Sequence, residues 1–153
     1  MANRDVISGK TVKEMFPNLG KDAGKFPVRE GESKWTADEA REVADALLTE
    51  SHRLDEDLRL EDAALTEFLR NSGEGSGDDQ ADYGSSALER EQELALLNNT
   101  RDVLEQNLHA LARIGLGTFG SCENCEKPVG KARQQAFPRA TLCVECKQRQ
   151  ERG

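Results

Sequence analysis

Four cysteines near the C-terminal end form the strongest chemical pattern in this 153-residue sequence. Cys122 and Cys125 make one C-x-x-C pair, Cys143 and Cys146 make a second, and seventeen residues separate the two pairs. Two thiolates three residues apart on a tight turn can bind one side of a tetrahedral ion, and a second pair can bind the other side. The spacing therefore predicts one zinc ion held by all four cysteines.

The alternatives to a zinc site are two disulfides or four free thiols. The sequence opens MANRDVISGK, which is not a secretory signal, and no apolar run approaches the length of a membrane span. We therefore expect a cytoplasmic protein, and in that reducing compartment paired cysteines favour a metal over disulfides. Four protein ligands close the coordination shell, so the expected zinc is structural and not catalytic.

Residues 116–153 are expected to form a small zinc-finger module around these cysteines. A segment this short, with few large apolar residues, rarely buries enough surface to fold alone. Zinc binding contributes on the order of 10 kcal/mol to such modules, which is enough to replace the missing core.

Charge is distributed unevenly along the chain. Residues 35–115 contain seven Lys or Arg and twenty Asp or Glu, a net of −13, whereas residues 1–34 carry +2 and residues 116–153 carry +3. Phosphate backbones would repel the acidic middle, so direct DNA binding is not expected there. His52 and His109 have no matching nucleophile or open metal position, and the sequence indicates no enzyme.

The first long helix is expected to start after Trp35. Thr36 and Glu39 form a capping box, in which each side chain accepts a hydrogen bond from a backbone N–H at the helix start. An apolar stripe then follows in steps of four and three, the pattern of a coiled-coil seam. Its members are Ala40, Ala44, Leu47, Ser51, Leu54, Leu58, Glu61, Leu65 and Phe68. The helix should end near residues 71–73.

A second long helix is expected to start at Ser86, which forms a capping box with Glu89, and to stop at Gly115. Its stripe contains Arg90, Leu94, Leu97, Arg101, Leu104, Leu108 and Leu111. Two long helices with one apolar seam each can bury both seams by folding into an antiparallel hairpin over residues 35–115. Oligomerisation through the same seams is the competing outcome. Ser51, Glu61 and Arg101 should weaken the seam locally.

The expected fold is mostly α: a long antiparallel helical hairpin followed by the four-cysteine zinc finger, with a disordered N-terminal tail. The tail comprises residues 1–34, which have six glycines or prolines and no sustained periodicity. Within it, residues 12–19 could dock on a partner, but a solvated tail is the favoured interpretation.

The connection between the helices, residues 72–86, is rich in Gly, Ser and Asp and gives the hairpin an acidic tip. Asp79 and Asp82 are three residues apart and would share a face if this stretch is helical. Such a carboxylate pair suits contact with arginines or bound magnesium. From the spacing alone, a solvated loop is the favoured interpretation.

An acidic-tipped helical hairpin followed by this finger resembles the DksA/TraR family of bacterial RNA polymerase regulators. The resemblance covers about residues 35–151 and is most specific in 115-GLGTFGSCENCEKPVGKARQQAFPRATLCVEC-146. There the cysteine spacing is accompanied by Val129, Gly130, Ala132, Arg133 and Pro138. The run 26-FPVREGESKWTADE-39 is also similar to the start of family members with an added N-terminal tail.

The resemblance implies a function and a second set of site residues. In the family the coiled coil enters the secondary channel of RNA polymerase, and a D-x-x-D-x-A motif at the tip acts near the active-site magnesium. This chain reads 79-DQADYG-84, so Asp79 and Asp82 match the aspartates while Gly84 stands in place of alanine. Some family members also respond to guanosine tetraphosphate, but no nucleotide pocket is identifiable in the sequence.

We therefore expect a transcription regulator that binds RNA polymerase without sequence-specific DNA binding. One alternative is a GATA-like zinc-finger DNA-binding protein, because the gap between the cysteine pairs also suits that class. The low isoelectric point of about 4.9 argues against it. The other alternative is a redox sensor whose cysteines release zinc on oxidation.

Overall fold

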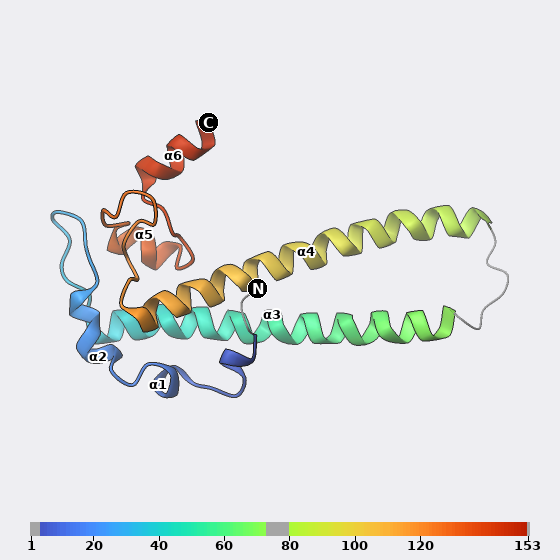
Figure 1. Cartoon of the computed structure of the whole chain (residues 1–153), viewed down its shortest axis with the longest axis horizontal. Helices are drawn as coiled ribbons and strands as arrows, with labels where there is room; N and C mark the ends of the chain where they lie inside the picture. The colour runs from blue at the N-terminus through green and yellow to red at the C-terminus, as the bar shows by residue number, and fades with distance from the viewer. Residues whose placement is uncertain (1–3, 73–79, 153) are drawn as a thin grey trace. The chain divides into compact units, whose positions relative to one another are not determined.

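Two long helices contain about half of the described residues. The structure is a computed structural model that describes the backbone of residues 4–72 and 80–152 and the side chains of residues 4–71 and 87–152. The long helices are α3 (Ala37–Ser72) and α4 (Gln80–Leu116) (Figure 1). The short helices are η1 (Arg4–Ile7), α1 (Val12–Met15), α2 (Leu19–Asp22), η2 (Ala23–Lys25), α5 (Lys131–Ala136) and α6 (Val144–Arg152). The described residues form no strand, only one isolated antiparallel bridge between Ser121 and Pro128. The mostly helical fold confirms the expectation.

The chain divides into two compact units. One consists of Met1–His52 together with Glu105–Gly153, and the other is Arg53–Leu104. The first unit contains the short helices, the beginning of α3, the end of α4 and all four cysteines. Within the described ranges, no helix has an apolar run long enough to cross a lipid bilayer.

The start of α3 has the predicted capping box. The Thr36 amide donates to Glu39 Oε1 at 2.9 Å, and the Glu39 amide donates to Thr36 Oγ1 at 3.1 Å. Just before it, Trp35 belongs to a buried aromatic cluster with Phe26 and Phe119, whose ring centroids lie 5.5 to 6.4 Å apart in edge-to-face geometry. This cluster joins the N-terminal segment, α3 and the beginning of the cysteine region.

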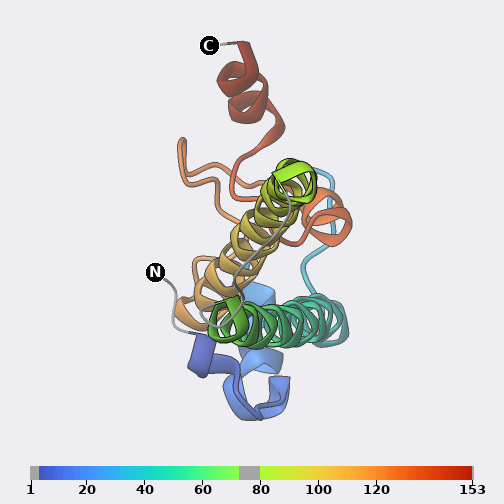
Figure 2. The same cartoon turned by 90° about the vertical axis from the view of Figure 1, so that its right-hand side faces the viewer.

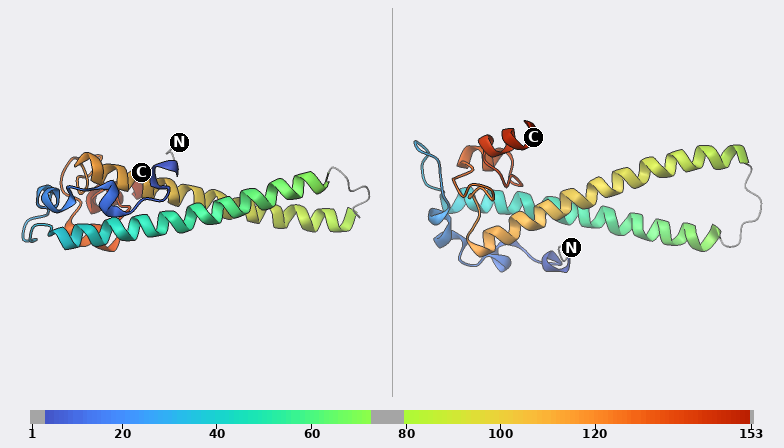
Figure 3. Two further views of the ribbon diagram at one scale, coloured as in Figure 1. Left: turned by 90° about the horizontal axis from the view of Figure 1, so that it is seen from below. Right: turned by 45° about the horizontal axis from the view of Figure 1, so that its top comes forward.

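Residues 4–34 lie in the segment expected to be disordered, but the structure differs: residues 4–25 contain four short helices, and residues 26–34 follow as a loop in the same first unit. Figures 2 and 3 show this segment (blue) alongside the beginning of α3 and the end of α4. The Ile7 carbonyl accepts a hydrogen bond from His52 Nε2 at 2.7 Å, and the Phe16 ring lies against Gly115. Five of its apolar residues are buried: Ile7, Val12, Leu19, Ala23 and Phe26. The proposed docking patch at residues 12–19 is thus partly covered by the chain itself.

The predicted seam is packed in the first unit. Ala40, Ala44, Leu47 and Ser51 of α3, and Leu108 and Leu111 of α4, are buried there. The Ser51 hydroxyl donates to the Leu47 carbonyl at 2.6 Å, so this polar seam residue is satisfied within its own helix. Asn107 Nδ2 donates to Glu50 Oε1 at 2.9 Å and links the two helices.

In the second unit the same seam is packed only in part. Leu54, Leu58 and Leu104 are buried, but the predicted seam residues Leu65, Phe68 and Leu94 are 43 to 46% exposed. Charged side chains connect α3 and α4 in this unit. Arg101 forms an ion pair with Asp62 at 3.5 Å, and the Arg90 guanidinium lies 4.6 Å from the centre of the Phe68 ring. The two pairs follow one another in opposite directions along α3 and α4, so the helices are antiparallel here, as predicted. The sequence did not reveal the partner of Arg101, which is Asp62.

Both predicted ends of the second helix were wrong. The helix begins at Gln80 and not at Ser86, which lies within it, because a capping-box pattern can also occur inside a helix that continues past it. It ends at Leu116, one residue beyond Gly115. Gly117 has a left-handed φ of +80°, and the amides of Gly117 and Thr118 donate to the carbonyls of Ile114 and Arg113 at 3.3 and 3.0 Å. This is a Schellman motif with Gly117 as its left-handed residue.

Candidate metal centre

The first cysteine pair lies on a tight turn. The Cys122 amide donates to the Lys127 carbonyl at 2.8 Å, and the Glu126 amide donates back to the Cys122 carbonyl at 2.9 Å. Glu126 has a φ of +67°, which closes the turn. Cys122 and Cys125 are thereby presented from one short loop.

The second pair is positioned by α6. Cys143 immediately precedes this helix and Cys146 lies in its first turn, with the Lys147 amide bonded to the Cys143 carbonyl at 2.9 Å. The Glu123 amide donates to the Thr141 carbonyl at 2.9 Å, which ties the first loop to the approach of the second. The first cysteine pair and the residues just before the second pair therefore lie side by side.

The four sulfurs fit one zinc ion. All four Sγ atoms lie within 4.8 Å of one another, and the Sγ atoms of Cys125 and Cys143 are 3.7 Å apart. Zinc–sulfur bonds of about 2.3 Å in a tetrahedron require sulfurs separated by about 3.8 Å. Three of the cysteines are buried and Cys125 is half-buried. Cys122, Cys125, Cys143 and Cys146 thus form the site for one structural zinc, as predicted.

The surroundings of the sulfurs affect their ionisation in opposite directions. Burial alone would raise the pKa of Cys122, but hydrogen bonds from nearby backbone amides together lower it to about 6. Burial raises the pKa of Cys143 to about 12. A bound zinc ion favours the thiolate form of its ligands, so binding releases protons and the affinity falls with decreasing pH. Asn124 Nδ2 donates to Cys146 Sγ at 3.2 Å.

Two buried polar side chains that the sequence did not single out shape the finger. Gln134 is fully buried, and its Nε2 donates to the carbonyls of Phe137, Pro138 and Ala140 at 3.1 to 3.2 Å. Arg113 on α4 donates to the Thr118 carbonyl at 2.8 Å and to the Ser121 carbonyl. Both satisfy backbone carbonyls of irregular loops, so their roles depend on a conformation that sequence periodicity does not reveal.

The two histidines have structural partners. His52 bonds the Ile7 carbonyl, and His109 Nε2 bonds Glu123 Oε1. Among the described residues, the four cysteines are the one group positioned to hold a metal ion.

The predicted tip residues are only partly described. Asp79 lies outside the described residues. Asp82 and Gly84 belong to the backbone of α4, in its first two turns, and their side chains lie outside the description. Their role therefore stays a prediction.

Comparisons with known proteins show what the cysteine region is similar to. Residues 117–152 match the prokaryotic DksA/TraR C4-type zinc finger. The chain is 39% identical over 74 residues to the RNA polymerase-binding transcription factor DksA of Caulobacter vibrioides, covering 48% of this chain and 52% of that protein. It is 55% identical over 31 residues to Protein TraR of Escherichia coli, covering 20% and 42% of the two chains.

Two further similarities extend over more of the chain. General stress protein 16O of Bacillus subtilis is 28% identical over 85 residues, covering 56% of this chain and 52% of that protein. The solved structure of transcription factor DksA2 from Pseudomonas aeruginosa matches with a TM-score of 0.60 over 97% of this chain and 95% of that one, at 24% identity.

The similarity to the DksA/TraR family is thus strongest in the C4-type zinc finger, residues 117–152, which is less than half of the chain. The structural match shows a DksA-like fold. The chain spans about half the length of the curated DksA and general stress relatives that it matches.

Proposed function

We propose that this protein is a transcription regulator that acts by binding RNA polymerase, not by enzymatic catalysis. The observation that carries this proposal is the 74-residue match, at 39% identity, to a Caulobacter protein named as an RNA polymerase-binding transcription factor. The C4 finger and the DksA-like fold support it.

The proposed contact with the polymerase is made by the connection between α3 and α4. The family resemblance implies that this connection enters the secondary channel and that Asp79 and Asp82 act near the active-site magnesium. The acidic character of residues 72–86 supports the proposal, since carboxylates favour contact with cations in such a channel. The large negative charge of residues 35–115 favours a protein partner over duplex DNA.

A two-part experiment tests this function. Purified zinc-loaded protein is first incubated with core RNA polymerase and recovered by affinity capture, and we expect the polymerase to co-purify at low salt. Asp82→Asn is then compared with Asp78→Asn, which makes the same charge change in the same connection. We expect Asp82→Asn to keep binding and lose the effect on transcription in vitro, while Asp78→Asn keeps both.

Two outcomes would contradict the proposal in different ways. If the polymerase does not co-purify, the partner is wrong. If Asp82→Asn and Asp78→Asn behave alike in transcription, the partner stands but the assigned role of Asp82 is wrong.

A further inference from the structure

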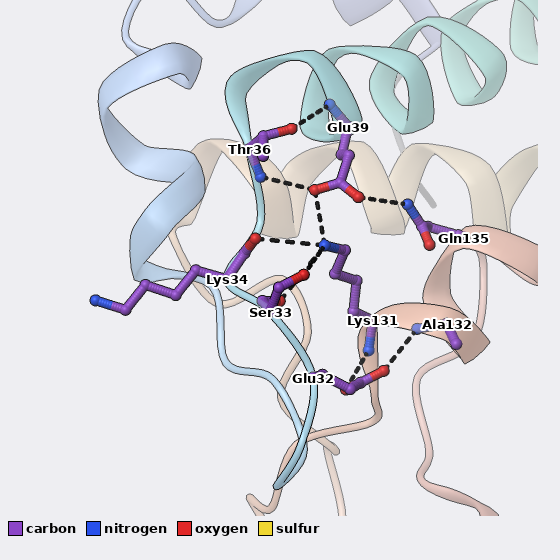
Figure 4. Close-up of polar contacts among 8 residues, drawn as sticks. All are labelled: Glu32, Ser33, Lys34, Thr36, Glu39, Lys131, Ala132 and Gln135. Carbon is purple, nitrogen blue, oxygen red and sulfur yellow. Dashed lines mark hydrogen bonds and ion pairs between the residues drawn. The ribbon is translucent and has the colours of Figure 1, made fainter.

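The loop that precedes α3, residues 29–34, reaches across to the zinc finger, and Figure 4 shows its polar contacts. Glu32 is at the centre of this contact. Its Oε1 accepts hydrogen bonds from the Lys131 amide at 2.9 Å and the Arg29 amide at 2.7 Å, and its Oε2 accepts one from the Ala132 amide at 2.9 Å. The Ala132 amide is the largest influence lowering the pKa of Glu32. A carboxylate about a hundred residues away in sequence thus holds the beginning of α5.

The Lys131 side chain makes a second contact with the same loop. Its ammonium is nearly buried and lies 2.8 Å from Glu39 Oε1 and 3.0 Å from Ser33 Oγ (Figure 4). The carbonyls of Ser33 and Lys34 lie 3.4 and 3.3 Å from the same nitrogen. This lysine is held by the loop and by α3, so its charge is neutralised within the protein.

Arg29 makes a third contact, on the other part of the finger. Its Nη2 donates to Glu145 Oε1 at 3.0 Å, and Glu145 lies between Cys143 and Cys146. The Arg29 side chain also crosses Gly130 closely: a Cβ at Gly130 would lie 3.0 Å from Arg29 Cδ. Glycine at position 130 therefore permits the loop to approach this closely.

These contacts attach one loop to both halves of the zinc site. Gly130, Lys131 and Ala132 follow the first cysteine pair, whereas Glu145 lies inside the second. We propose that residues 29–34 form a zinc-dependent latch, which closes on the finger when zinc fixes the spacing of the two cysteine pairs and opens when zinc is lost. By thermodynamic linkage, a closed latch in turn retains the zinc more tightly.

The latch predicts how protease sensitivity depends on zinc in the unmodified 153-residue chain. Arg29 and Lys34 are sites for trypsin within the latch, and Arg41 in α3 provides an internal reference. We expect cleavage after Arg29 and Lys34 to be slow with zinc bound and to become at least about tenfold faster after chelation, because local opening controls cleavage. Cleavage after Arg41 should change much less. Equal acceleration at all three sites, or no acceleration, would overturn the proposal.

A matched pair of variants tests the reverse coupling, in which the latch retains the zinc. Glu32→Gln removes the charged acceptor, and Glu30→Gln makes the same change at an exposed position of the same loop. With excess chelating dye, we expect Glu32→Gln to release zinc at least about fivefold faster than wild type, and Glu30→Gln to match wild type. Equal release from both variants would overturn the coupling. If Glu32→Gln does not fold, the proteolysis of unmodified protein still decides the question.

Discussion

The Lys131 ammonium lies 2.8 Å from Glu39 Oε1, so a residue of the zinc finger forms an ion pair with the first turn of α3. Glu39 is also the residue that completes the capping box with Thr36. One carboxylate therefore both starts the long helix and fastens the finger to it.

This ion pair predicts a pH-dependent contribution to stability. The hydrogen bond from Lys131, followed by that from the Thr36 amide, lowers the pKa of Glu39 from 4.5 to about 2. Because the folded pKa is below the unfolded one, the contribution is full above pH 4.5 and is lost as the pH falls toward 2. We expect Glu39→Gln to be less stable than wild type at pH 7, with a difference that narrows below pH 4.5. Chemical denaturation followed by circular dichroism measures this difference.

Glu42→Gln is the control for that prediction, because Glu42 is exposed on the same helix. Its stability should follow that of wild type across the pH range. A difference for Glu39→Gln that does not change with pH would contradict the ion-pair explanation.

The end of α4 predicts opposite effects for two neighbouring glycines. Gly117→Ala forces a side chain into a left-handed conformation and should lower the free energy of unfolding by about 1–2 kcal/mol. Gly115→Ala lies in the last helical turn, where its Cβ would make an ordinary contact at 3.4 Å with the Phe16 ring. It should raise stability by about 0.5–1 kcal/mol. Urea denaturation of both variants distinguishes Gly117 from Gly115 as the position that needs glycine.

The partial seam of the second unit predicts unequal costs for two leucines of α4. Leu104 is 2% exposed and Leu94 is 45% exposed. Leu104→Ala should destabilise the protein by about 2–5 kcal/mol, because it leaves a cavity in a packed seam. Leu94→Ala should change stability by no more than about 0.5 kcal/mol. Thermal or urea unfolding measures the stability of both variants. Equal decreases in the free energy of unfolding would mean that the seam is packed equally well at both positions.

Loss of one cysteine should abolish zinc binding. A serine hydroxyl at position 143 stays protonated at neutral pH and cannot replace the thiolate, so Cys143→Ser should lower the zinc content from about one per chain toward zero. The finger should unfold while the long helices keep most of the helical signal. Ser121→Ala, next to Cys122, is the control and should keep its zinc. Metal analysis and circular dichroism provide the two readouts, and full zinc content in Cys143→Ser would contradict the four-cysteine site.

The sequence predicted the features that depend on local pattern or short spacing. The four zinc ligands, the Thr36 and Glu39 capping box, and the seam as far as Leu58 all follow from such patterns. The exposed seam beyond Leu58 did not, because apolar periodicity shows which residues share a face and not whether a partner covers that face.

Other features depend on tertiary contacts that no local pattern reports. The N-terminal helices have only three or four residues each, too few to show a helical period, and long-range packing orders them. Glu32, Arg113 and Gln134 act by accepting from or donating to particular backbone groups of distant or irregular segments. Their residue types alone carry no signal of these roles.

The most direct test of the proposed function is a crosslinking map from the acidic connection. A photoreactive residue in place of Tyr83, next to Asp82, is activated in a mixture of the zinc-loaded protein and core RNA polymerase. We predict crosslinks to polymerase segments that adjoin the catalytic magnesium. A control probe replaces Phe137, which is exposed on the finger. Crosslinks confined to the outer surface of the polymerase would contradict the account. So would a crosslink yield from the Tyr83 probe that is no higher than that from the Phe137 probe.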